Sequence, residues 1–174
     1  MRAKPLSLLA ALGTAAHHGF ETRAGVGLVF EPFLGRRRTA ALWLAALPFW
    51  MRRAARPAPR DEPLLAFQAG VAIAGAGVHF VAWPWSLRGG VLPWLDEAEG
   101  LEPSQLPAYN TILWLWMIGG AGSALLETRR RDRRWVLAGI ATGPLLLASA
   151  RHHFRWAREQ AEREPARWSA ALRS

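Results

Sequence analysis

The distribution of charge constrains this sequence more than any other feature. Five long stretches contain no charged residue, and arginines crowd into the gaps between them. Two of the stretches, residues 64–87 and 103–126, exceed the roughly 18 apolar residues that are typical of a transmembrane helix. The others are residues 5–20, 39–51 and 135–150. This segregation predicts a chain that places apolar segments in a membrane and arginine clusters outside it.

The predicted fold is an all-α, polytopic integral membrane helix bundle with five transmembrane helices. The stretch at residues 39–51 is short, contains Pro48 and is bracketed by arginines. It could instead lie flat in the membrane interface, which leaves four transmembrane helices plus an interfacial helix as the alternative. Residues 1–155 are predicted to form a single transmembrane domain, and residues 156–174 a basic amphipathic tail.

The positive charge is interpreted through membrane topology. Lys and Arg number 22 against 13 Asp and Glu, but the basic residues flank apolar stretches instead of forming one patch with interleaved aromatic residues. Nucleic acid is therefore not expected as a partner. The cluster at residues 129–134 fits a cytoplasmic loop of a multi-pass protein in the cell membrane, with the lipid bilayer as the main partner. The chain has no cysteine, which excludes disulfides, thiol catalysis and thiolate metal sites.

The five histidines share one position in this pattern, because each lies near the C-terminal end of an apolar stretch. If the five-helix prediction holds, all of them reach the outer face of the membrane. Glu21 follows His17 by four residues and His18 by three, so these side chains can meet on one helical face. His79 ends a stripe of small or polar residues spaced by four, three and four positions, comprising Gln68, Ala72, Gly75 and His79.

These residues carry the predicted chemistry. His17, Glu21 and His79 are the candidate catalytic residues, and the candidate metal ligands are His17, His18, Glu21 and His79. Imidazole and carboxylate together can bind iron, copper or zinc, or can transfer a proton. The possible cofactors are therefore a metal ion or haem. The competing interpretation is that the histidines only anchor helix ends at the interface, since no metal-binding spacing of high specificity is present.

Two classes of function remain open at the level of sequence. The first is a membrane enzyme acting on a lipid or other apolar substrate, by metal-dependent redox chemistry or by acid–base isomerisation. The second is a non-catalytic membrane subunit or scaffold that forms homo- or hetero-oligomers. Gly139 and Gly143 form a G-x-x-x-G motif, which predicts a surface where another helix approaches closely.

Overall fold

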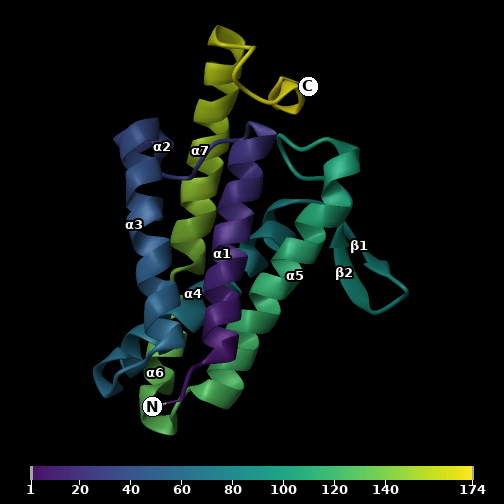
Figure 1. Cartoon of the computed structure of the whole chain (residues 1–174). Coiled ribbons are helices and arrows are strands. Elements are labelled where there is room, and N and C mark those ends of the chain that lie inside the picture. The colour runs from purple at the N-terminus through teal and green to yellow at the C-terminus, as the bar shows by residue number, and fades with distance from the viewer. Residues whose placement is uncertain (1, 174) are drawn as a thin grey trace.

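The computed structural model describes residues 2–173, most of which lie in helices. Helices α1, α3 and α7 run along a common axis, and α5 crosses them at a tilt (Figure 1). A two-stranded antiparallel hairpin projects beside α5. The helices are α1 (Pro5–Ala24), α2 (Glu31–Leu34), α3 (Arg36–Ala55), α4 (Glu62–Ala82), α5 (Leu106–Gly122), α6 (Arg133–Ile140) and α7 (Gly143–Arg163), and the strands are β1 (Trp85–Arg88) and β2 (Leu92–Leu95).

Helix boundaries follow from proline and glycine. A proline lies in the first turn of α1, α4, α5 and α7, where its missing N–H group leaves no helical hydrogen bond unmade. Helix α1 ends at Ala24 and is capped by Gly25, whose φ of 76° is the left-handed conformation that glycine adopts without strain. The N–H of Val26 then donates to the carbonyl of Glu21. This cap holds Glu21 in the last full turn of α1.

Glycines allow the helices to approach through their backbones. A Cβ atom on Gly119 of α5 would lie 2.4 Å from the backbone nitrogen of Ala10 in α1. A Cβ on Gly139 of α6 would lie 2.3 Å from the carbonyl oxygen of Phe67 and 2.8 Å from the Cα of Gly70, both in α4. Helix α1 therefore packs on α5, and α4 on α6, at distances that leave no room for a residue larger than glycine at these positions.

Polar groups tie the start of α1 to two other segments. Glu127 ends a π-helical turn, η3 (Ser123–Glu127), and its carboxylate accepts hydrogen bonds from the N–H groups of Leu6 and Ser7, both at 2.8 Å. It therefore caps α1 from outside the helix. The Lys4 ammonium donates to the buried carboxylate of Glu62 at 2.5 Å. Both contacts join residues that are far apart in the sequence.

The structure overturns the prediction of five transmembrane helices. Within residues 2–173, one helical segment, Pro59–Ala82, is long and apolar enough to cross a membrane. Of its most apolar window, 56% is buried inside the fold, and a core helix passes the same test. The four-helix alternative fails for the same reason. The prediction of an all-α fold also omitted the β1–β2 hairpin.

The physical reasons lie in the individual stretches. The stretch at residues 135–150 is not one helix, because α6 ends at Ile140 and α7 begins at Gly143. Pro144 has no N–H group to donate to the carbonyl of Ile140, so the first helix cannot continue through it. Helix α3 contains the short stretch but extends into the arginines on both sides of it. The stretch at residues 103–126 forms helix α5 over only 17 residues, fewer than the roughly 18 that are typical of a transmembrane helix.

Several large apolar side chains nevertheless lie on the protein surface formed by residues 2–173. Leu126 is 80% exposed, Leu145 70% and Leu137 67%. Scattered single leucines on a surface are ordinary, and it is their number that is unusual here.

Candidate functional site

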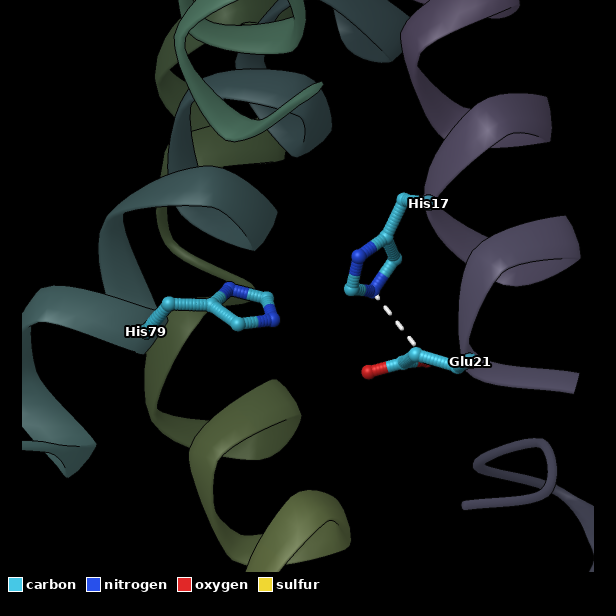
Figure 2. A group of neighbouring side chains, drawn as sticks. All are labelled: His17, Glu21 and His79. Carbon is cyan, nitrogen blue, oxygen red and sulfur yellow. Dashed lines mark ion pairs between the residues drawn. The ribbon is translucent and has the colours of Figure 1, made fainter. Parts of the chain in front are cut away.

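The site is built where the C-terminal ends of α1 and α4 meet. His17 and Glu21 lie one turn apart on α1, and the Nε2 atom of His17 is 3.3 Å from Oε2 of Glu21. His79 comes from the last turn of α4, and its ring centroid is 4.8 Å from that of His17. Figure 2 shows the three side chains pointing toward one another from the two helices. They are residues of the predicted site, and the fold brings them together.

The three residues form a candidate set of metal donors. One donor atom from each of His17, Glu21 and His79 can be chosen so that all lie within 4.8 Å of one another. Donors about 2.1 Å from a common ion can be no more than about 4.2 Å apart. Small side-chain rotations would therefore close the set around an ion. Two histidines and one carboxylate leave further coordination positions open.

The protein fixes the tautomer of His79. Its Nδ1 atom is 2.7 Å from the carbonyl oxygen of Gly75. A carbonyl only accepts, so Nδ1 carries the proton and Nε2 has a free electron pair. A backbone carbonyl that orients an imidazole in this way is the usual second partner of a metal-bound histidine.

Tyr109 of α5 forms a hydrogen bond with the second oxygen of the Glu21 carboxylate. Its hydroxyl donates to Oε1 of Glu21 at 2.9 Å, while Oε2 faces His17. Burial raises the pKa of Tyr109 well above its ordinary value, and the negative charge of Glu21 raises it further. The phenol therefore stays protonated and remains a donor.

In the His17–Glu21 pair, the negative charge belongs to Glu21 and the imidazole is neutral. Burial lowers the pKa of His17 to about 3, although the Glu21 carboxylate opposes that shift. Burial alone would raise the pKa of Glu21, but His17 and His18 outweigh it and the net direction is downward. A neutral imidazole beside a carboxylate is the state that a metal ion requires.

Trp116 of α5 positions His17. Its ring stacks on the His17 imidazole, with centroids 5.0 Å apart and planes inclined by 27°. Glycines make room for it, since a Cβ on Gly75 would lie 2.5 Å from the indole ring and one on Gly13 would lie 2.7 Å from the Trp116 backbone. The small-residue stripe on α4 thus admits an aromatic side chain from α5.

The remaining histidines have separate surroundings. Nδ1 of His18 is 3.8 Å from Glu21, and its ring packs on Trp43 with centroids 4.0 Å apart, outside the three-residue donor set. His153 is buried, and its Nε2 atom is 3.1 Å from the carbonyl oxygen of Val26. His152 stacks on Phe33 instead. Of the four predicted metal ligands, the structure therefore gathers three.

A largely apolar cavity of about 140 Å³ adjoins the site. His17, Glu21 and His79 all line it, together with side chains from α3, α5 and α7. His153 is among them, although the sequence predicted only an interfacial position for it. The donors therefore face a space in which an apolar molecule can bind.

Two supporting residues, Tyr109 and Trp116, were absent from the predicted site. Tyr109 is the only tyrosine of the chain, and Trp116 follows it by two helical turns on the same face of α5. That spacing was the available signal. It does not reveal which helix the face meets.

Comparisons with protein-family models, curated proteins and solved structures find no match to this chain.

Proposed function

We propose that the protein is a metal-dependent enzyme that acts on an apolar substrate. The observation that carries this proposal is the convergence of His17, Glu21 and His79 on a largely apolar cavity. Two histidines and a carboxylate are the donors of many non-haem metal centres. The neutral imidazoles would bind the ion, Glu21 would balance its charge, and Tyr109 would orient Glu21 through their hydrogen bond.

The identity of the metal would separate redox from non-redox chemistry. Iron favours redox chemistry, whereas zinc would polarise a substrate oxygen for isomerisation. If no ion binds, the acid–base alternative can still use Nε2 of His79 as a proton acceptor. The non-catalytic scaffold has no comparable observation in its favour.

Metal binding is the direct test. Titration of the purified protein with Co²⁺, followed by visible absorption, should give one site per chain. His79→Phe and Glu21→Gln should each weaken binding by roughly 100-fold or more, because loss of an outer-shell partner alone costs about 10–100-fold. His152→Phe is the matched control, since His152 packs on Phe33 away from the site. Equal losses in all three variants, or no binding by the wild type, would refute the metal proposal.

The same titration should show little competition from protons. An ordinary histidine is protonated below a pKa of about 6.5 and then cannot bind metal. Because burial lowers the pKa of His17 to about 3, its imidazole stays unprotonated between these values. Co²⁺ affinity at pH 5.5 should therefore remain within a few-fold of its value at pH 7.5. A tenfold loss per pH unit would contradict this assignment of charge.

We further propose that the protein associates with lipid, which would supply an apolar substrate. Leu145 is 70% exposed, and it directly precedes Leu146 and Leu147, which line the cavity. The arginine cluster at residues 129–134 complements anionic headgroups. Exposed apolar side chains beside a cavity wall and clustered positive charge therefore both favour a lipid surface as the partner.

Flotation with vesicles of equal parts phosphatidylglycerol and phosphatidylcholine tests lipid association. Leu145→Glu should weaken binding roughly tenfold or more, since contact of one leucine with lipid is worth about 1.5–3 kcal/mol. Val91→Glu is the matched control, because Val91 is 82% exposed but lies in the turn of the hairpin. Wild-type protein that stays with the aqueous fraction would rule out lipid association.

A further inference from the structure

A buried amide side chain lies in the same cavity, about three helical turns before His79 on α4. Gln68 of α4 lines the cavity and is only 3% exposed, yet neither its Nε2 nor its Oε1 atom has a hydrogen-bond partner among residues 2–173. Burying an amide without partners costs about 1–3 kcal/mol. Such a group in a binding cavity indicates that a ligand completes its hydrogen bonds.

Two indole nitrogens also lack partners, nearer the metal donors, because Trp116 stacks on His17 and Trp43 packs on His18. Nε1 of Trp43 and Nε1 of Trp116 are buried without a partner, and both side chains line the cavity. An indole N–H only donates, whereas the Gln68 amide both donates and accepts. A ligand that satisfies these groups must therefore carry an acceptor, and a hydroxyl group would also donate to Oε1 of Gln68.

The cavity further restricts the charge of the ligand. Glu21 is the only charged side chain among its described lining residues, which include neither lysine nor arginine. A carboxylate or phosphate held there would be buried without a counter-charge, which is strongly unfavourable. The polar group of the ligand should therefore be neutral.

The distance along α4 gives the shape of the ligand. Gln68 and His79 lie on one stripe of the helix, and between them Ala72 and Gly75 line the cavity. Eleven residues at about 1.5 Å each separate the two ends by roughly 16 Å. A molecule that reaches both must be elongated, with an apolar middle.

We infer that the substrate is an elongated apolar molecule whose neutral hydroxyl or carbonyl group is bound by Gln68 while its other end lies at the His17–Glu21–His79 site. This inference rests on the proposed function, because it names the substrate class of that site. Gln68 is thus the residue that selects an oxygenated molecule over a plain hydrocarbon.

The test uses three ten-carbon probes on metal-free protein, followed by the intrinsic fluorescence of the tryptophans in the cavity wall. Wild-type protein should bind 1-decanol about threefold to tenfold more tightly than 1-chlorodecane, which corresponds to one net hydrogen bond. Decanoate should bind more weakly than 1-decanol. Gln68→Met should abolish the preference for 1-decanol and leave 1-chlorodecane binding unchanged.

Gln160→Met on α7, outside the cavity lining, is the matched control and should behave as wild type. A wild type without the preference, or tightest binding of decanoate, would overturn the inference. Because Gln68→Met should still bind Co²⁺ normally, failure of this inference is distinguishable from failure of the metal site.

Discussion

Gly139→Ala should lower the free energy of unfolding by about 3 kcal/mol or more. The added Cβ would lie 2.3 Å from the carbonyl oxygen of Phe67 and 2.7 Å from the backbone nitrogen of Val71. Both atoms belong to the backbone of α4, so they cannot move without displacing that helix. Overpacking commonly costs about 1–3 kcal/mol where side chains can adjust, and here they cannot. Thermal and denaturant unfolding of the purified variant measure the loss.

Gly143→Ala is the control for this substitution. The nearest atom to its added Cβ would be the Cβ of Ala74 at 3.8 Å, which is ordinary contact. Stability should therefore change by less than about 0.5 kcal/mol. Equal stability of the two alanine variants would contradict the close backbone approach of α4 and α6. The G-x-x-x-G motif predicted that both glycines contribute, whereas Gly139 pairs with Gly70 instead.

Glu62→Leu should destabilise the protein by about 3–5 kcal/mol, because it leaves the Lys4 ammonium buried without its counter-charge, with only the carbonyl of Glu127 as a hydrogen-bond partner. The side chain of Glu62 is 2% exposed and that of Lys4 11%. The lost contact also joins the start of α1 to the start of α4. Glu164→Leu is the control, since Glu164 forms an exposed ion pair with Arg167 and such pairs contribute about 0–1 kcal/mol.

The double variant Lys4→Met, Glu62→Leu separates loss of the pair from loss of packing. Two apolar side chains need no counter-charge, so most of the stability lost in Glu62→Leu should return. A double variant that loses as much stability as Lys4→Met and Glu62→Leu added together would show that the two residues act independently.

The sequence predicted the part of the site that helical spacing determines. His17 and Glu21 are four residues apart on one helix, so their proximity follows from local geometry. Their approach to His79 depended on α1 and α4 running in the same direction, for which the topology prediction was only a hypothesis. Tyr109 and Trp116 reach the site through the packing of α5, which no local spacing predicts.

The error in the fold has a physical cause. An apolar stretch without charges suits the core of a helical protein as well as the interior of a membrane. Length separates the two only when the helix is continuous, and residues 135–150 are interrupted before Pro144. The role of Glu127 also could not be predicted from its local sequence. The arginine cluster begins two residues after it and suggested a partner there, but its carboxylate caps α1.

The hydrogen bond from Tyr109 to Glu21 has a consequence for the lifetime of the protein. Glu21 belongs to α1, Tyr109 to α5 and the facing His79 to α4, so one small cluster joins three helices. An ion bound there would stabilise the folded chain in proportion to the logarithm of its free concentration. Metal supply would then determine how much of the protein escapes proteolysis, and scarcity would reduce its abundance before any loss of catalytic rate per molecule.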